Sequence, residues 1–556
     1  MILKGAEIIT QVLIEEGVDT VFGYPGGSVL DLYDALYMHR DQITHYITAH
    51  EQGASHAADG YARATGKTGV VISTSGPGAT NLVTGIATAY MDSVPLVALT
   101  GNVSTGLIGR DSFQEVFITG ITMPITKHNF IVRRVEDLAD TLRKAFAIAQ
   151  EGRKGPVLVD LPKDVMQNSC EFTPKTPVAP KLHEAEESAV AAAAALINES
   201  KRPLLYFGGG VQQSGAGEEL RALIEKADIP ACYTLMAAGV LGYGERNNLG
   251  LLGMHGCFTS NKAADQADLI LAVGTRFSDR VALNTQKFGR NAKILHMDID
   301  PSEVGKNVRA DASVVGDIKD ALTKLLPLVS PAVHEEWHEA IDEWKKQDYT
   351  PTDSETTLKP HQVIGAICDI AGENALYVTD VGQHQMWAAQ YIRHTQPRHF
   401  LTSGGLGTMG YGYGASIGAR IATGKDNRAM PVVHITSDGS FHMNMNEACT
   451  AVSYNLPIIS VIMNNAVLGM VRQWQTVFYG KRYSASEPER KTDFAKVAEG
   501  FGAKGYRCTT LEEFRAAFAE AMKQTGPVWI ECVIDREERV LPMIPAGGTV
   551  DDIIMN

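Results

Sequence analysis

The stretch SDGSFHMNMNEACTAVSYNLPIISVIMNNAVLGM, residues 437–470, carries the most information about the fold. It follows an apolar run and contains an Asp438-Gly439 turn, an amphipathic segment, a second apolar run and then Asn464-Asn465. This order predicts a βαβ unit with Asp438 and Asn465 at the carboxyl ends of two parallel strands, where open α/β sheets bind ligands. Carboxylate and amide oxygens suit Mg²⁺, which takes its other ligands from water and phosphates. A βαβ unit whose turn simply carries polar residues would show the same pattern, so this stretch alone leaves both interpretations open.

The composition is that of a globular protein with several domains. The chain has 556 residues, too many for one hydrophobic core, with 44% apolar and 21% charged residues. A net charge of −14 argues against nucleic acid or an anionic membrane as the main partner. The seven scattered cysteines form no CxxC pair, so we expect reduced thiols in a cytoplasmic protein without disulfides or a zinc site. We recognise neither a membrane span of ~18 apolar residues nor a targeting peptide before the helix expected at residues 6–17.

Two polar segments with prolines, residues 168–184 and 346–360, predict inter-domain linkers. Between the linkers, short runs rich in Val, Ile and Leu alternate with helical segments, a pattern typical of α/β proteins with doubly wound parallel sheets. We expect three such domains and a C-terminal tail, at residues 1–167, 185–345, 360–535 and 536–556.

The first and third domains share an internal repeat. Residues 70–102 lie without gaps on residues 432–464 after a shift of 362 positions, with Thr-Ser at the first strand end and a proline seven residues before the final Asn. Convergent packing explains part of this match, and duplication of one α/β module explains it better. The first copy has Gly76-Pro77-Gly78 in place of the acidic turn. We therefore expect two related modules, one chelating and one not, to build a single site between them.

Several motifs together indicate a family. They are YPGG at residues 24–27 with HEQGA at 50–54, the 437–470 stretch, DVGQHQMWAAQ at 380–390 and GGLGTMGYGYGASIGA at 404–419. Over essentially the whole chain they resemble the acetolactate synthase (acetohydroxyacid synthase) family of thiamine-diphosphate-dependent enzymes. The resemblance implies decarboxylation of pyruvate on thiamine diphosphate and ligation of the hydroxyethyl unit to a second 2-keto acid, pyruvate or 2-ketobutyrate. This reaction is the first common step of valine, leucine and isoleucine biosynthesis.

The resemblance assigns the proton chemistry to Glu51. Taken alone, a glutamate at an expected helix start is explained by the positive partial charge of the helix N-terminus. By resemblance, Glu51 bonds the distal pyrimidine nitrogen of the cofactor and so assists proton transfer. Met409, ordinarily a core filler, would hold the cofactor in its bent shape, and Gln114 would lie near the reacting carbonyl.

The resemblance implies further residues for the cofactor, the metal and the substrates. The metal set is Asp438, Asn465 and Val467, and Val467 offers only its backbone carbonyl. The catalytic set is Glu51, Gln114, Lys127, Arg280, Met409 and Trp474, of which Trp474 is otherwise explained as a packing residue and by resemblance favours 2-ketobutyrate. The thiamine diphosphate set is Pro25, Gly26, Glu51, Pro77, Asn81, Val381, Gly382, Gln383, His384, Gly407, Met409, Asp438, Gly439, Ser440, Asn465, Gly469 and Met470.

Glycine-rich turns in the middle domain resemble the FAD-binding segments of the biosynthetic enzymes. Glycines let the backbone approach a pyrophosphate, and the run VGTRFSDRVAL at 273–283 adds two arginines. Ligation of two keto acids moves no net electrons, so this FAD would be structural. The FAD set is Gly208, Gly209, Gly210, Thr234, Leu235, Met236, Gly253, Met254, His255, Gly274, Arg276, Arg280, Asp298, Ile299 and Asp317.

The resemblance also implies an assembly and leaves two rivals. The site would lie between the first domain of one chain and the third domain of another, in a homodimer or homotetramer. No regulatory-type domain is recognisable after residue 535, which leaves room for a separate small regulatory subunit. The rival functions are a flavin-dependent pyruvate oxidase or decarboxylase, and a non-catalytic regulatory paralogue.

Overall fold

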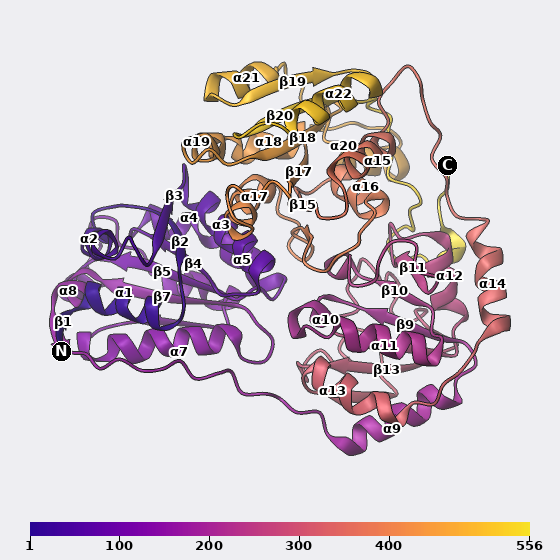
Figure 1. Ribbon diagram of the computed structural model, residues 1–556, viewed down its shortest axis with the longest axis horizontal. Helices are drawn as coiled ribbons and strands as arrows, with labels where there is room; N and C mark the ends of the chain where they lie inside the picture. Colours follow the sequence, from indigo (N-terminus) through magenta and orange to yellow (C-terminus); the bar gives the residue numbers. More distant parts are fainter.

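The computed structural model describes all 556 residues and contains three α/β domains, each built on a six-stranded parallel sheet. In Figure 1 the first domain lies at the left, the third at the top and the middle domain at the lower right. The expected fold class is thereby confirmed. None of the helices combines the length and apolar character needed to cross a membrane.

The first sheet has the order β3-β2-β4-β5-β7-β6. Beside it, β1 (Ile2–Lys4) pairs antiparallel with β8 (Ser169–Glu171). The strands are β2 (Thr20–Tyr24), β3 (Thr44–Ile47), β4 (Gly69–Ser73), β5 (Leu96–Asn102), β6 (His128–Ile131) and β7 (Pro156–Pro162). The helices are α1 (Gly5–Glu15), α2 (Leu30–Met38), α3 (Glu51–Thr65), α4 (Pro77–Asn81), α5 (Val83–Met91), α6 (Ile118–Thr122), α7 (Leu138–Gln150) and α8 (Lys163–Gln167).

The third sheet has the order β16-β15-β17-β18-β20-β19. Its strands are β15 (Leu376–Thr379), β16 (Phe400–Leu401), β17 (Val432–Ser437), β18 (Ile458–Asn464), β19 (Lys504–Cys508) and β20 (Val528–Val533). Its helices are α15 (Pro360–Ala371), α16 (Gln383–Tyr391), α17 (Tyr411–Ala422), α18 (Asp438–Asn444), α19 (Ala448–Ser453), α20 (Gly469–Phe478), α21 (Phe494–Phe501) and α22 (Leu511–Ala521).

The first and third sheets have the same topology. Counted along the chain, both place their strands in the order second, first, third, fourth, sixth, fifth. The repeated segments fall on equivalent strands, β4 with β17 and β5 with β18, and β5 and β18 keep the same bounds after the shift of 362 positions. The predicted relationship between the two domains is therefore confirmed.

The middle sheet has a different topology, β11-β10-β9-β12-β13-β14, which is the strand order of dinucleotide-binding folds. Its strands are β9 (Pro203–Phe207), β10 (Ala231–Tyr233), β11 (Asn248–Leu251), β12 (Leu269–Val273), β13 (Lys293–Asp298) and β14 (Ala312–Val315). Its helices are α9 (Glu187–Glu199), α10 (Gly209–Ser214), α11 (Gly217–Ala227), α12 (Phe258–Gln266), α13 (Ile318–Leu325) and α14 (Glu335–Lys345).

The C-terminal tail ties the third domain to the middle one. The side-chain amide of Gln383 donates to the carbonyl oxygen of Glu538 at 2.8 Å, and that of Gln473 donates to Val540 at 3.0 Å. Further along, the Ile544 N–H donates to the carbonyl oxygen of Met254 in the middle domain at 2.8 Å. Residues 536–556 therefore pack across the boundary between these two domains.

The first and third domains meet through α3 and α17, which approach so closely that glycine is required. A Cβ atom on Gly418 would lie 1.8 Å from the carbonyl oxygen of Ala57, and one on Gly60 would lie 2.2 Å from that of Ala415. These are backbone atoms inside helices, so they cannot move aside. The sequence therefore sets the distance between the two domains.

A buried charge network surrounds this helix contact. The Arg63 guanidinium bonds Asp59 at 2.6 Å and Asp92 at 2.9 Å, and it donates to the carbonyl oxygen of Thr402 at 2.9 Å. The Tyr411 hydroxyl donates to Asp59 at 2.7 Å. The side chains of Asp59, Arg63, Asp92 and Tyr411 are all buried, and their bonds cross the boundary between the two domains. This network of buried charges therefore holds the domains in one orientation.

We predict that Gly418→Ala lowers the free energy of unfolding by about 3 kcal/mol, because the added methyl group overpacks a rigid backbone contact. Thermal and urea unfolding of the whole chain measure this change. Gly365→Ala in α15 is the matched control, since a Cβ there meets no atom within 4 Å. That control should leave stability unchanged or raise it by roughly 0.5–1 kcal/mol. Equal effects of the two substitutions would contradict the role of the α3–α17 contact.

Candidate functional site

The first-domain residues expected near the cofactor gather at the carboxyl ends of β2 and β4. Glu51 is the first residue of α3, and the side-chain amide of Asn81 donates to its carboxylate at 2.9 Å. A Cβ on Gly78 would lie 3.2 Å from the same carboxylate. The turn at Pro77 therefore packs directly against Glu51.

Two loops complete this first group. A Cβ on Gly26 would lie 2.5 Å from the Thr74 side chain, which places the Pro25-Gly26 turn beside the end of β4. A Cβ on Gly76 would lie 2.8 Å from the Cα of Gln114, a residue with a left-handed φ of 58°. The structure thus brings Pro25, Gly26, Glu51, Pro77, Asn81 and Gln114 together.

Asp438 and Asn465 form the second group, at the ends of β17 and β18. Asp438 is 3% exposed and one of its carboxylate oxygens, Oδ1, has no hydrogen-bond partner. Burial raises the pKa of Asp438 to about 6. A buried oxygen without a partner is unfavourable unless a ligand satisfies it. This oxygen therefore fits a cation.

Val467 takes part in this loop through its backbone. Its side chain is buried, and its N–H donates to Oδ1 of Asn465 at 3.3 Å. No cluster of three or more His, Cys, Asp or Glu side chains in the chain could hold a metal ion. A cation here would complete its shell with main-chain oxygen and with phosphate oxygens of a ligand, as Mg²⁺ commonly does.

Residues of α16 and α17 surround the same edge of the third sheet. Gly382 precedes α16 with a left-handed φ of 151°, and a Cβ there would lie 2.9 Å from the His384 ring. Burial lowers the pKa of His384 to about 4, and neither of its ring nitrogens has a hydrogen-bond partner. His384 is therefore a neutral, unsatisfied side chain that suits a bound polar group.

Met409 lies over the start of α18. Its methyl group is 3.9 Å from the position of a Cβ on Gly439, and the Gly410 N–H donates to the Ser440 hydroxyl at 3.1 Å. At Gly469, a Cβ would lie 2.0 Å from the Gln383 amide oxygen. The expected residues Gln383, Met409, Gly439, Ser440 and Gly469 thus join the second group.

Within one chain the two groups remain separate. The first and third domains exchange hydrogen bonds close to them, from the Ala49 and His50 N–H groups to Glu447 and between Thr88 and Thr408. None of the hydrogen bonds in the structure joins Glu51 or Asn81 to Asp438 or Asn465. Within one chain the two groups are therefore not joined directly by hydrogen bonds.

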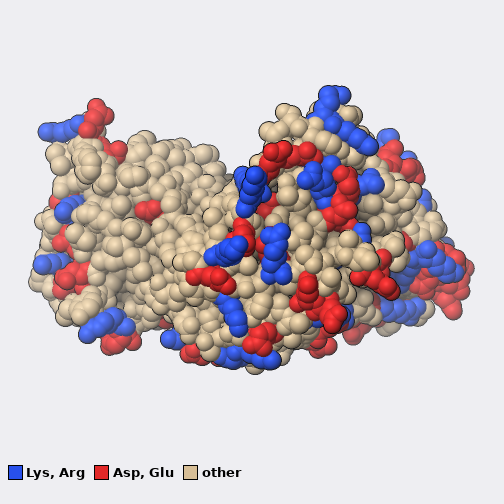
Figure 2. Space-filling model, turned by 90° about the horizontal axis from the view of Figure 1, so that it is seen from above, with Lys and Arg blue, Asp and Glu red and all other residues tan.

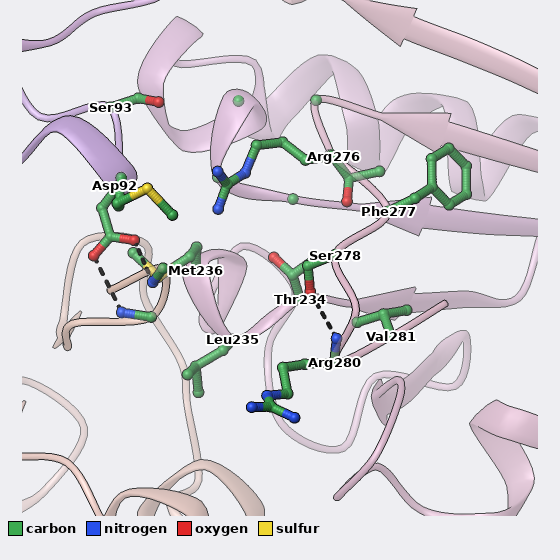
Figure 3. Close-up of a pocket in the computed structure, with 18 of the residues that line it drawn as sticks. Asp92, Ser93, Thr234, Leu235, Met236, Arg276, Phe277, Ser278, Arg280 and Val281 are labelled. Atoms are coloured by element: carbon green, nitrogen blue, oxygen red, sulfur yellow. Dashed lines mark hydrogen bonds between the residues drawn. The ribbon is translucent and has the colours of Figure 1, made fainter. Parts of the chain in front are cut away.

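A cavity of about 1440 Å³ opens between the middle domain and the other two. Its walls include every residue of the expected FAD set except Gly253, which lies behind the wall against the Arg280 carbonyl. A Cβ on Gly210 would lie 2.7 Å from the Cα of Gly274, so the two glycine turns need their bare backbones. Figure 3 shows Arg276 extending toward the side of the cavity lined by Asp92 and Ser93. Its size and glycine turns fit a dinucleotide.

The cavity also reaches the carboxyl edge of the third sheet. Five residues expected there for the cofactor or the substrate line its wall, namely Val381, Gly382, Gly407, Met470 and Trp474. The indole of Trp474 packs edge-on against Phe478. The large cavity and the edge of the third sheet where residues expected for the cofactor lie are therefore continuous.

Some lining residues were missed from the sequence. Asp92 and Ser93 follow α5, and the Asp92 carboxylate accepts hydrogen bonds from the N–H groups of Gly404 and Gly405 at 3.1 and 2.7 Å. Arg153 reaches from the first domain to Asp300 and Glu303 of the middle domain at 3.3 and 2.7 Å. No local pattern indicates these contacts, because they exist only once the domains are assembled.

Lys127 does not lie with either group. It precedes β6, at the amino end of that strand, and its ammonium donates to the carbonyl oxygens of Ile148 and Glu151 at the end of α7. The opposite edge of the sheet carries Glu51. The structure therefore gives Lys127 a role in closing the end of a helix.

Comparison with known proteins is consistent across the chain. Residues 3–121, 190–325 and 380–532 match the models of the N-terminal TPP binding, central and C-terminal TPP binding domains of thiamine pyrophosphate enzymes. The chain is 45% identical to the probable acetolactate synthase large subunit of Methanocaldococcus jannaschii, over 99% of this chain and 95% of that protein. It is 41% identical to the acetolactate synthase isozyme 3 large subunit of Escherichia coli, over 99% of this chain and 98% of that protein. It is also 45% identical to the acetolactate synthase large subunit of Mycobacterium tuberculosis, over 99% of this chain and 91% of that protein.

We predict that Lys127→Met leaves turnover within about threefold of the wild type, far from the ~10²-fold loss typical of a proton-transfer group. We also predict that the substitution changes the stability of the protein in a way that depends on pH. Burial lowers the pKa of Lys127 to about 8 from 10.5, so between these values the unfolded chain binds more protons than the folded one. The wild type should therefore gain stability relative to the variant as the pH rises from 8 to 10.5. Paired thermal unfolding curves measure the difference, and a large loss of turnover would return Lys127 to the site.

Proposed function

Because the chain belongs to the thiamine pyrophosphate enzyme family, within its acetolactate synthase large subunits, we propose that it makes 2-acetohydroxy acids from two 2-keto acids. Pyruvate is decarboxylated, and its two-carbon unit is transferred to a second pyruvate or to 2-ketobutyrate. One observation carries the proposal: the unsatisfied Asp438 oxygen beside Asn465, at the edge of the domain that matches the C-terminal TPP binding model.

Thiamine diphosphate, when bound, supplies an electron sink for cleavage of the bond next to the keto carbonyl. Mg²⁺ held by Asp438, Asn465 and the Val467 carbonyl would neutralise its diphosphate. The neutral His384 ring and the residues around Gly382 would bind phosphate oxygens. Met409, next to Gly439, would support the bent cofactor.

Glu51 is the proposed proton-handling residue. The Asn81 amide holds one carboxylate oxygen at 2.9 Å and so orients the group. The other oxygen, which faces Gly78, would hold a proton against the pyrimidine nitrogen of the cofactor. Gln114, fixed over the Gly76 turn, would lie near the reacting carbonyl of the substrate.

The middle domain would hold FAD as a structural group. The strand order of its sheet, the close contact of Gly210 with Gly274 and the lining arginines support this proposal. Arg276 would pair with the pyrophosphate. Arg280 and Trp474 line the same cavity as Met470, so they would receive the carboxylate and the side chain of the second keto acid.

The separation of the two half-sites supports a homodimer in which each site takes its halves from different chains, either alone or within a homotetramer. Large apolar side chains lie exposed near the first group, with Phe113 at 87% and Phe117 at 71% exposure. Figure 2 shows a broad face, at its left, on which few charged side chains appear. Since the relatives are named large subunits, we also propose a separate small regulatory subunit.

The products distinguish this function from its rivals. With pyruvate, thiamine diphosphate, Mg²⁺ and FAD, we expect acetolactate, and addition of 2-ketobutyrate should shift the product to 2-aceto-2-hydroxybutyrate. Chromatography of the products and flavin absorbance measured during turnover provide the test. Acetate or acetyl phosphate formed together with flavin reduction at the turnover rate would instead support a pyruvate oxidase. Failure to bind thiamine diphosphate and Mg²⁺ would support a non-catalytic paralogue.

We predict that Glu51→Gln lowers turnover by at least ~10²-fold, the lower range for loss of a proton-transfer partner. Glutamine keeps the size of the side chain and still accepts from Asn81, so cofactor affinity should change little. Steady-state kinetics and cofactor titration separate the two quantities. Near-normal turnover would exclude Glu51 from the proton chemistry.

Mixing two inactive variants checks the shared site. In a dimer formed from Glu51→Gln and Asp438→Asn chains, one site combines an intact Glu51 with an intact Asp438. After exchange of subunits we expect about a quarter of the wild-type activity, as random pairing of two chains in a twofold dimer requires. No recovery would place both halves of the site within one chain.

A further inference from the structure

The side chain of Asn464, immediately before the proposed metal ligand Asn465, links a buried carboxylate to the metal loop. Its Nδ2 donates to Oε1 of Glu531 at 2.7 Å, and its Oδ1 accepts from the N–H of Ala466 at 2.9 Å. An amide has its donor and its acceptor at opposite ends. Glu531, which can only accept when ionised, therefore determines which end of Asn464 faces the loop.

The loop that carries Asn465 and Val467 needs a restraint on its backbone. Ala466 lies between the proposed ligands Asn465 and Val467 and has a left-handed φ of 58°. For a residue with a Cβ this conformation is unfavourable, and it persists only where the surroundings hold it. The bond from the Ala466 N–H to Asn464 restrains this conformation, so the orientation of Asn464 also affects the positions of both ligands.

Glu531 is placed for this task by the sheet. It lies on β20 opposite Ile462 of β18, and its side chain is completely buried. Its second contact is the half-exposed Arg507, at 3.3 Å. A carboxylate buried between two strands is unfavourable for folding unless its partners compensate. Its retention in the core calls for a reason beyond packing.

The first domain contains a similar arrangement without a metal loop, in which the asparagine accepts from the next residue instead of the second one. Asp160 on β7 lies opposite Thr100, and Thr100 is the residue that the shift of 362 positions places on Ile462. Nδ2 of Asn102 donates to Asp160 at 2.6 Å, and its Oδ1 accepts from the Val103 N–H at 2.7 Å. In both domains a buried carboxylate thus orients the asparagine that ends the neighbouring strand. Only in the third domain is that asparagine followed by a left-handed residue, Ala466, between two proposed ligands.

We propose that Glu531 is a positioning residue for the cation site, acting through Asn464 on the loop of Asn465 and Val467. The proposal rests on the proposed function, because it assumes that a divalent cation binds there with thiamine diphosphate. Without the Glu531 bond, Asn464 is free to rotate and Ala466 loses its restraint. The loop ligands would then lose their preset geometry, and cation affinity would fall.

The test measures cation affinity directly. Mn²⁺ serves as the probe, titrated into the full-length protein with saturating thiamine diphosphate and followed by electron paramagnetic resonance. Glu531→Leu should raise the Mn²⁺ dissociation constant about 10–100-fold, the usual effect of removing a residue that orients a metal ligand. Glu531→Gln keeps the acceptor oxygen for Asn464 and should rescue most of this affinity.

The first domain provides the matched control. Asp160→Leu removes the equivalent buried acid, so it should lower the melting temperature as Glu531→Leu does while leaving Mn²⁺ affinity at the wild-type value. Equal Mn²⁺ affinity in Glu531→Leu and the wild type would overturn the proposal. A loss of affinity as large in Asp160→Leu would overturn it as well, since general destabilisation would then be the cause.

A second variant covers the outcome in which Glu531→Leu does not fold. Asn464→Ala removes both bonds of the amide without burying a new side chain, and we expect the same 10–100-fold loss of Mn²⁺ affinity. Unchanged affinity in this variant would overturn the proposal. If the wild type itself binds no Mn²⁺ with thiamine diphosphate, the proposed function fails, and this result is distinct from failure of the Glu531 role.

Discussion

The contact between α3 and α17 is the constraint on which the rest of the structure depends. Gly60 and Gly418 let two helix backbones touch, and the Arg63 network fixes their orientation with charges that are largely buried. Glu51 begins α3, and Met409 lies two residues before α17. Each helix therefore carries one half of the proposed chemistry. Since neither helix can shift against the other, the two groups of one chain are held at a fixed separation, and in the proposed homodimer a second chain would complete each of them.

The same contact shapes the large cavity. Asp92 bonds Arg63 on one side and the Gly404 and Gly405 N–H groups on the other, so a helix-packing network extends directly into the cavity wall. Arg153 then joins the first domain to the middle one across the neighbouring wall. A dinucleotide filling this space would contact all three domains. Such a ligand would stabilise the assembled domains relative to an opened arrangement, which is a physical reason for the proposed structural role of FAD.

The sequence predicted the features that depend on local order. Asp438 and Asn465 were placed at strand ends by alternation and turn residues alone, and the repeat at residues 70–102 indicated two related sheets, which the shared strand order confirms. The family resemblance supplied Glu51 and the glycine turns of the cavity. Contacts between distant segments were not predictable in this way. Arg63, Asp92 and Arg153 carry no motif, and their contacts across domains or elements involve partners 29 to 339 positions away. Lys127 shows the converse, since a residue matched by resemblance alone lies at the amino end of its strand, away from the carboxyl ends where the first group gathers within the chain.

Divergence of the two modules explains why a chain with a net charge of −14 can hold a diphosphate. The first module replaced its acidic turn with Gly76-Pro77-Gly78, which brings bare backbone against Glu51 and Gln114. The second kept Asp438, whose negative charge repels phosphate unless a divalent cation lies between them. In the proposed site, attraction would therefore depend on the cation and on neutral groups such as His384, and hardly at all on the overall field of the protein. In the proposed site, an anion arriving without a cation would meet the buried Asp438 carboxylate and be repelled.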